Sequence, residues 1–336
     1  MRKLIRFLAF LILILVVIYL MGPKPPMVEL NKDLPSISAS IGNIEDYVKR
    51  NDEGLTLKPD HESRIIWAND TVKERTQYSL LYLHGFSASW YEGYPANVEF
   101  ASYFGCNAYF PRLASHGIVT EDALIDMTPD RLWESAKDAL MVARALGRKV
   151  IIMSTSTGGT LALKLASDFP EYVDGLILYS PNIRINDNSA FLLSKPWGLQ
   201  IGRRSIGGNY RVVNEDFDSK YCKYWDCKYR MEAVVFLQQL VEETMIKPTW
   251  KNVNEPVFLG YYYKDETQQD DIVKVDAMLK MFDHLGTQSD LKVKVAFPEA
   301  GNHVIASELL SGEYKNVIAQ TIKFGEEVLK LKPANK

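Results

Sequence analysis

The segment Ile151-Ile152-Met153-Ser154-Thr155-Ser156-Thr157-Gly158-Gly159 joins an apolar run to the start of a helical stretch through small residues alone. Such a sequence predicts a buried strand, a sharp turn and a helix in immediate succession. Ser156 stands at the centre of the turn. The first amide groups of the helix and the helix dipole favour negative charge at that point. Ser156 is therefore the first candidate for a nucleophile.

Strand-like and helix-like segments alternate on both sides of this turn. Most of the strand-like runs are continuously apolar, which indicates burial on both faces. The clearest helix covers residues 129–146, because Thr128 can cap it, Pro129 suits its first turn and Gly147 follows its end. The alternation predicts a mostly parallel, twisted sheet with helices on both faces. Strands are expected at residues 64–68, 78–83, 107–111, 149–153, 175–179, 257–263 and 292–297, and further helices after Ser156 and at 41–50, 231–245, 278–285 and 317–331.

An earlier strand ends in Leu81-Tyr82-Leu83-His84-Gly85-Phe86-Ser87, with a histidine-glycine-aromatic triplet directly after an apolar run. This loop and the turn at Ser156 together resemble the oxyanion-hole loop and the nucleophile elbow of α/β-hydrolase-fold enzymes. The resemblance extends over about residues 62–330. It implies the α/β-hydrolase fold with an inserted helical cap. The sequence departs from the family pattern at Ser154, where the family usually has a glycine.

The resemblance also implies an oxyanion hole. The backbone N–H groups of Phe86 and Thr157 would bind the negative oxygen of a tetrahedral intermediate. Gly85 lets the backbone turn sharply and approach a substrate. His84 is expected to be structural, because a catalytic triad needs only one histidine.

The general base is expected in the loop Pro298-Glu299-Ala300-Gly301-Asn302-His303-Val304, directly after the last expected strand. The α/β-hydrolase family keeps its base in this place, so the resemblance selects His303 from five histidines. His61 lies in the N-terminal segment and His284 on an expected helix. His116 lies in a loop that resembles the histidine-glycine turn of carboxylesterases and monoacylglycerol lipases, where the histidine is structural.

The acidic residue of the triad is expected after the penultimate strand, which runs into Tyr263-Lys264-Asp265. Asp265 lies at the expected distance from the start of the strand and is the preferred residue. The loop is longer than usual, and Asp270 and Asp271 remain alternatives, because an aspartate a few residues before a valine also fits the family pattern. The chain order of serine, aspartate and histidine is that of the α/β-hydrolase triad.

A long interval separates the fifth and sixth expected strands. Residues 184–250 are expected to form the cap, inserted in a core of residues 62–183 and 251–332. The aromatic residues of the cap either form its own small core or face an apolar substrate site, and both can hold for different residues. Its acidic residues Glu215, Asp216 and Asp218 would suit the free amine of a peptide substrate. The aromatic residues are Trp197, Tyr210, Phe217, Tyr221, Tyr224, Trp225, Tyr229, Phe236 and Trp250.

Three basic residues precede an unbroken apolar run over residues 7–21. Its length fits either the core of a signal peptide or a short membrane-spanning helix. The run ends without the small residues that cleavage requires, and Pro23 follows closely. Both features favour an uncleaved anchor that consists of residues 1–24. The basic residues before the run are expected to keep the N-terminus in the cytoplasm and to place the rest of the chain outside it, in the cell envelope. Residues 25–61 are expected to be a stalk and entry segment.

The charge and the cysteines exclude other classes of protein. The net charge of −3 comes from 39 basic and 42 acidic residues dispersed along the chain, which therefore lacks a basic patch for nucleic acid. The three cysteines lack the spacings with histidine of a zinc site, so no metal is expected. Cys222 and Cys227 either form a local disulfide, if the chain is exported, or stay reduced, while Cys106 is expected to pack in the core. No cofactor and no obligate protein partner is implied.

The resemblance implies a serine hydrolase that cleaves carboxylic esters through an acyl-enzyme, similar to a carboxylesterase or a monoacylglycerol or lysophospholipid lipase. A small-molecule or lipid ester would be its substrate. Two alternatives stay open, namely an aminopeptidase of the same fold and a binding protein that kept the fold and lost catalysis.

Overall fold

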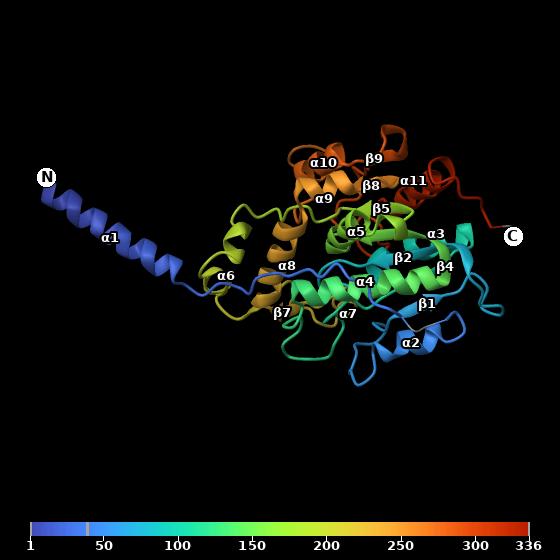
Figure 1. Ribbon diagram of the computed structural model, residues 1–336, viewed down its shortest axis with the longest axis horizontal. Coiled ribbons are helices and arrows are strands. Elements are labelled where there is room, and N and C mark those ends of the chain that lie inside the picture. The colour runs from blue at the N-terminus through green and yellow to red at the C-terminus, as the bar shows by residue number, and fades with distance from the viewer. Residues whose placement is uncertain (1, 38–39, 335–336) are drawn as a thin grey trace.

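A computed structural model describes residues 2–37 and 40–334, and within them a seven-stranded sheet forms the centre of the molecule (Figure 1). The strand order is β1-β3-β2-β4-β5-β8-β9. Neighbouring strands are parallel, except that β1 runs antiparallel to β3. All seven expected strands are confirmed, with small shifts at their ends. They are β1 (Arg64–Ile66), β2 (Thr76–Leu83), β3 (Asn107–Phe110), β4 (Gly147–Thr155), β5 (Gly175–Tyr179), β8 (Val257–Tyr261) and β9 (Lys292–Ala296).

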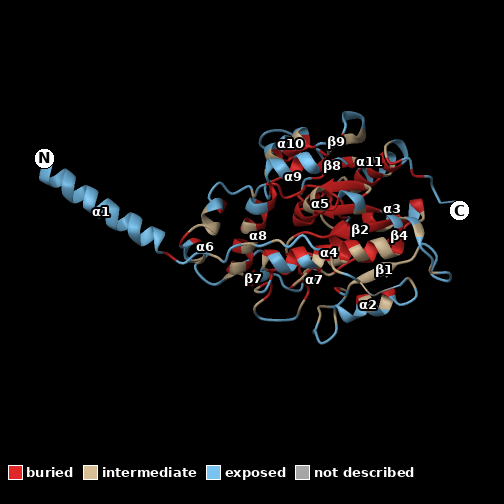
Figure 2. Ribbon diagram, viewed as in Figure 1, coloured by how far each residue is buried: buried red, intermediate tan, exposed pale blue. Residues whose placement is uncertain are grey.

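Helices cover both faces of the sheet, as expected. The strands are apolar on both faces: in β4, Ile152 belongs to one hydrophobic cluster and Ile151 and Met153 to the other. The first cluster includes α4, α5 and α10, and the second includes α3 and α11. Figure 2 shows the buried strands between these layers. The helices are α3 (Ala96–Phe104), α4 (Pro129–Leu146), α5 (Thr157–Asp168), α9 (Lys247–Asn252), α10 (Val275–His284) and α11 (Tyr314–Glu327).

Helix α4 has the predicted bounds, but its end signals act differently from expectation. Thr128 occupies the N-cap position without a side-chain hydrogen bond to the helix. Gly147 is extended and begins β4 instead of closing the helix in a left-handed conformation. A Cβ at Gly147 would lie 2.5 Å from the backbone nitrogen of Ser79. Glycine is needed there because β4 approaches β2 closely.

The chain between β5 and β8 forms the cap over one end of the sheet (Figure 1). A disulfide joins Cys222 to Cys227, which decides the alternative that the sequence left open. The cap also contacts the loop after β2, because the amide of Asp226 donates to the carbonyl of Ser87 (2.7 Å). The elements of the cap are α6 (Gly198–Ile206), β6 (Tyr210–Val212), α7 (Lys220–Tyr224), β7 (Lys228–Arg230) and α8 (Met231–Thr244).

The N-terminal helix α1 (Arg2–Leu20) buries none of its residues and extends away from the rest of the molecule (Figures 1 and 2). Part of the expected stalk and entry segment is packed along α4. The Lys137 ammonium, completely buried, donates to the carbonyls of Asn31 (3.1 Å) and Asp33 (2.6 Å). Within this segment α2 (Ile44–Arg50) contributes Ile44 and Val48 to the core.

Candidate active site

Ser156 lies in a strained turn between β4 and α5. Its backbone angles are φ 53° and ψ −117°, a region that non-glycine residues rarely adopt and that costs about 1–3 kcal/mol. Its amide donates to the carbonyl of Tyr179 (3.0 Å). Its carbonyl accepts from the amides of Gly159 (2.9 Å) and Asn182 (2.9 Å). These backbone hydrogen bonds hold the serine in the conformation that the sequence predicts for a nucleophile elbow.

Small residues let helix α5 begin close to the sheet. A Cβ at Gly158 would lie 1.9 Å from the carbonyl oxygen of Leu83, so only glycine fits there. Ser154, which replaces the usual glycine, is completely buried, and its hydroxyl donates to the carbonyl of Ile177 (3.4 Å). The serine side chain therefore fits between strand and helix and satisfies its own hydrogen bond.

The amides of Phe86 and Thr157, expected to form an oxyanion hole, belong to residues that line the same cavity as Ser156. Neither amide donates a hydrogen bond to another residue of the described chain. Both neighbours of Phe86 are fixed: the amide of Gly85 donates to Oε2 of Glu92 (2.6 Å), and that of Ser87 to Nε2 of His116 (3.1 Å). The loop is thus held while the amide of Phe86 is left available for a ligand.

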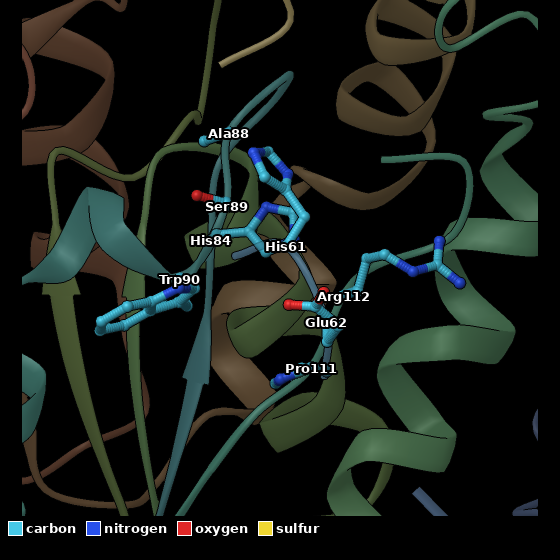
Figure 3. A pocket seen from close by; sticks show the side chains of 8 residues that line it. All are labelled: His61, Glu62, His84, Ala88, Ser89, Trp90, Pro111 and Arg112. Carbon is cyan, nitrogen blue, oxygen red and sulfur yellow. The ribbon is translucent and has the colours of Figure 1, made fainter. Parts of the chain in front are cut away.

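His84 and His116 support this loop. Nε2 of His84 accepts from the amide of Leu113 (3.1 Å), and the two rings meet edge to face with centroids 4.8 Å apart. Burial lowers the pKa of His116 to about 4 and the pKa of His84 well below its usual value. Both rings are therefore neutral acceptors near pH 7, in agreement with the structural role expected of them. Figure 3 shows His84 next to His61, with Arg112 nearby.

His303 follows β9, and its carboxylate partner is Asp270. Nδ1 of His303 lies 2.6 Å from Oδ2 of Asp270, whose side chain is fully buried. Burial lowers the pKa of His303, but the carboxyl groups of Asp270 and, to a smaller extent, Glu92 and Asp271 together raise it, so that the net pKa lies above its usual value. Because Nδ1 donates to Asp270, Nε2 is the nitrogen left to accept a proton.

Asp265, the residue preferred from the sequence, is therefore not the carboxylate that contacts His303. The loop after β8 folds back as a small hairpin, in which Tyr263 pairs with Gln269 and the amide of Lys264 donates to the carbonyl of Gln268 (2.9 Å). Asp265 stands at the exposed tip, where its carboxylate accepts from the hydroxyl of Thr267 (2.7 Å).

The second arm of the hairpin brings Asp270 back to the end of β8. Its amide donates to the carbonyl of Tyr262 (3.2 Å). Oδ1 of Asp270 accepts from the amides of Ile272 (2.9 Å) and Val273 (3.0 Å), which leaves Oδ2 for His303. The other alternative, Asp271, is exposed and lines the outer part of the cavity.

Ser156 and His303 line one cavity of about 710 Å³. Nε2 of His303 is buried and has no hydrogen-bond partner among the described residues. Three of the nine aromatic residues of the cap, Tyr221, Trp225 and Tyr229, line this cavity, and Tyr229 meets Phe86 edge to face with centroids 5.0 Å apart. Other aromatics have other surroundings. Trp250 is buried, whereas Phe217 is 54% exposed. The role in lining the site is therefore found for three of these aromatics, whereas the buried Trp250 belongs to the main hydrophobic cluster and not to a separate core of the cap.

Glu92 is a residue of this site that the sequence analysis missed. It lies in the short helical turn Trp90–Gly93, is 2% exposed and lines the cavity. Burial raises the pKa of its carboxyl group to about 7, although hydrogen bonds from the amide of Gly85 and the hydroxyl of Tyr82 oppose the shift. No sequence motif marks it, because the loop that brings it beside Gly85 has no characteristic spacing.

Within residues 2–37 and 40–334, no group of three or more histidine, cysteine, aspartate or glutamate side chains is arranged to hold a metal ion. The absence of a metal and of a cofactor from the reaction remains a prediction.

The sequence matches the model of the alpha/beta hydrolase family over residues 80–308, and the chain therefore belongs to this family. None of the curated proteins matches the chain significantly in sequence. Similar solved structures include one reported for LipS and LipT, two metagenome-derived lipolytic enzymes (TM-score 0.64, 16% identity, 80% of this chain and 98% of that chain).

Two further structures are similar. One is the monoacylglycerol lipase of Paleococcus ferrophilus (TM-score 0.56, 11% identity, 78% of this chain and 96% of that chain). The other is Est1E from Butyrivibrio proteoclasticus with bound ferulic acid (TM-score 0.53, 15% identity, 83% and 97%). At these identities the likeness shows the α/β-hydrolase fold, which agrees with the expectation from the sequence.

Proposed function

We propose that this member of the alpha/beta hydrolase family is a serine hydrolase of carboxylic esters, with Ser156, Asp270 and His303 as its triad. The observation that carries the proposal is the buried hydrogen bond between Asp270 and His303, which leaves Nε2 of the histidine in the cavity that Ser156 lines. Nε2 of His303 forms no hydrogen bond with the Ser156 hydroxyl in this structure. Hydrogen bonds between catalytic groups commonly tighten when substrate binds.

In the proposed reaction, Nε2 of His303 takes the proton of the Ser156 hydroxyl as Oγ attacks the ester carbonyl. The amides of Phe86 and Thr157 donate to the developing oxyanion. His303 then protonates the leaving alcohol, and an acyl-enzyme remains on Ser156. Water, deprotonated by His303, attacks the acyl carbonyl and releases the carboxylic acid. Asp270 stabilises the charged imidazole in both steps.

The walls of the cavity support an ester substrate more than a peptide. The acidic residues of the cap that would bind a free amine, Glu215, Asp216 and Asp218, are exposed and do not line the cavity. Aromatic and aliphatic side chains of the cap line it, including Trp225, Val234 and Leu237, together with the charged side chains of Asp187 and Arg211. A small or lipid ester with an apolar portion fits these surroundings.

The test is hydrolysis by the full-length protein in detergent. We expect turnover of p-nitrophenyl esters across a series of acyl lengths, at rates well above those of the matching p-nitroanilides. The acyl length with the highest kcat/KM would separate an esterase from a lipase. A folded protein that hydrolyses no ester in the series would overturn the proposal.

We also propose that helix α1 anchors the protein in a membrane, with the catalytic domain outside the cytoplasm. The helix has 19 residues and a mean hydropathy of 2.6, and none of it is buried. The disulfide between Cys222 and Cys227 supports an oxidising compartment, because such bonds rarely persist in the cytosol.

Deleting residues 1–21 is expected to convert a membrane-bound protein into a soluble one without loss of ester hydrolysis, since α1 buries no residue against the rest of the chain. Fractionation of expressing cells measures the first effect, and kcat/KM on a soluble ester, within about twofold of the full chain, measures the second. Full-length protein that alkaline carbonate releases from membranes would contradict the anchor.

A further inference from the structure

The two carboxyl oxygens of Glu92 have different surroundings. Oε2 accepts hydrogen bonds from the amide of Gly85 (2.6 Å) and the hydroxyl of Tyr82 (3.3 Å). Oε1 forms no hydrogen bond with any residue of the described chain. A Cβ at Gly85 would lie 2.7 Å from Oε1 and 3.0 Å from Cβ of Ser156, so Oε1 is a close neighbour of the nucleophile. One oxygen supports the oxyanion loop, and the other is free in the cavity.

We propose that Oε1 of Glu92 binds the substrate by accepting a hydrogen bond from a hydroxyl group that the ester carries within a few bonds of its scissile carbonyl. The inference rests on the proposed ester hydrolysis and specifies its substrate class. A carboxyl oxygen that lines a cavity and has no protein partner is available to a ligand, which can replace the solvent there with a direct hydrogen bond.

A second buried side chain supports a polar ligand at this end of the cavity. Asn182 is also 2% exposed and lines the cavity, and its Oδ1 has no hydrogen-bond partner among the described residues. The amide and carbonyl of Asn182 hold the start of α5, through the carbonyl of Ser156 (2.9 Å) and the hydroxyl of Thr160 (2.7 Å). Its position next to the nucleophile is therefore as fixed as that of Glu92.

A hydroxyl group suits Glu92 better than an ammonium group. The titratable groups that face its carboxyl are His303, Tyr82 and, from the cap, Tyr221, and no lysine or arginine of the described chain pairs with it. Its pKa of about 7 means that both protonation states are populated near neutral pH. A hydroxyl can donate to the carboxylate and accept from the carboxylic acid, whereas an ammonium group can pair only with the carboxylate.

The experiment compares esters that differ in one substituent, using full-length protein in detergent at pH 8, where Glu92 is mostly ionised. One set varies the alcohol side (hydroxyethyl, methoxyethyl and propyl butyrate). The other varies the acyl side (ethyl esters of β-hydroxybutyrate, β-methoxybutyrate and isovalerate). In one of the two sets, kcat/KM for the hydroxyl ester should exceed that for the methoxy ester about tenfold, the worth of one hydrogen bond of about 1.4 kcal/mol. The set of esters in which the hydroxyl compound is preferred shows whether Glu92 contacts the alcohol side or the acyl side.

Glu92→Gln keeps an oxygen for the amide of Gly85 and places an NH₂ group at the position of Oε1. Because this group donates to a hydroxyl and a methoxy oxygen alike, the ratio of their kcat/KM values should fall to about 1–2, whatever the effect of the variant on the rate for the alkyl ester. Glu255→Gln is the matched control, since Glu255 is also buried and does not line the cavity. In Glu255→Gln the ratio of kcat/KM for the hydroxyl ester to kcat/KM for the methoxy ester should equal that of the wild type.

The wild type alone provides a second measurement that needs no variant. At pH 5.5 the protonated Glu92 can donate to either oxygen, so the ratio of hydroxyl to methoxy ester should fall. Protonation of His303 slows the hydrolysis of both esters equally and leaves the ratio unchanged.

Alkyl ester hydrolysis without a hydroxyl preference, or a preference that Glu92→Gln retains, would overturn this inference alone. A preference for aminoethyl over hydroxyethyl butyrate would also overturn it, and failure to hydrolyse any ester would remove it together with the proposed function.

Discussion

Ser156→Ala is expected to reduce kcat for ester hydrolysis by about 10⁵–10⁶-fold, since loss of the nucleophile removes the whole covalent pathway. The structure gives a physical reason for so large an effect. The strained turn holds the serine where α5 begins, and Ser156 shares the cavity with Phe86 and Thr157, whose amides form no hydrogen bond within the described chain. A fluorophosphonate probe should label the wild type at Ser156 and leave the variant unlabelled, as peptide mass spectrometry will show.

Ser154→Ala is the control for this experiment. Ser154 lies two positions before Ser156, on β4, and is completely buried, and its hydroxyl makes only a long hydrogen bond of 3.4 Å. Labelling and turnover should stay within about threefold of the wild type, because the loss of one such bond affects stability more than catalysis. If Ser156→Ala folds and still hydrolyses esters at the wild-type rate, the reaction does not use this serine.

The sheet could be predicted because its sequence signals are local. Residues 175–179, for example, form a continuous apolar run, and both faces of β5 are covered. The same local signals located α4 and the turn at Ser156. Where a prediction required contacts between distant segments, the sequence was less informative. The expected stalk lies along α4 because Lys137 binds its backbone carbonyls, and nothing near residues 25–61 indicates that partner.

Glu92 shows the same limit within the site. A glutamate followed by glycine in a loop is expected to be a solvated surface residue. Its burial arises only when Trp90–Gly93 folds back against Gly85, which has no side chain to exclude the carboxyl group. The role of Gly85 is thus wider than the sequence suggests, because its missing Cβ leaves room for Oε1 of Glu92 beside Ser156.

The carboxylate partner of His303 was misassigned for a related reason. The distance from the strand start selects Asp265 if the loop leaves the strand directly. The pairing of Tyr263 with Gln269 shortens the effective loop and returns the chain to the sheet at Asp270. Val273, three residues after Asp270, was the informative signal, because its amide is one of the groups that orient the carboxylate of Asp270.

Asp270→Asn is expected to lower kcat by about 10³–10⁴-fold, whereas Asp265→Asn should change it less than about threefold. Both are aspartate-to-asparagine changes in the same loop, so they form a matched pair. Asp270 is buried with Oδ2 2.6 Å from His303, and Asp265 is exposed at the hairpin tip. Steady-state kinetics on one p-nitrophenyl ester measures both. Equal losses in the two variants would contradict the assignment of Asp270.

The pH dependence separates a catalytic role of Asp270 from a structural one. The carboxylate holds the pKa of His303 above its usual value, and only the neutral imidazole can take the proton of Ser156. The activity of the wild type should therefore fall as the pH drops through this raised pKa. In Asp270→Asn the pKa of His303 decreases, because burial continues to lower it while the opposing charge is gone, so the acid limb of the residual kcat/KM should move to lower pH. A variant that is merely less stable would lose activity with the acid limb in its wild-type position.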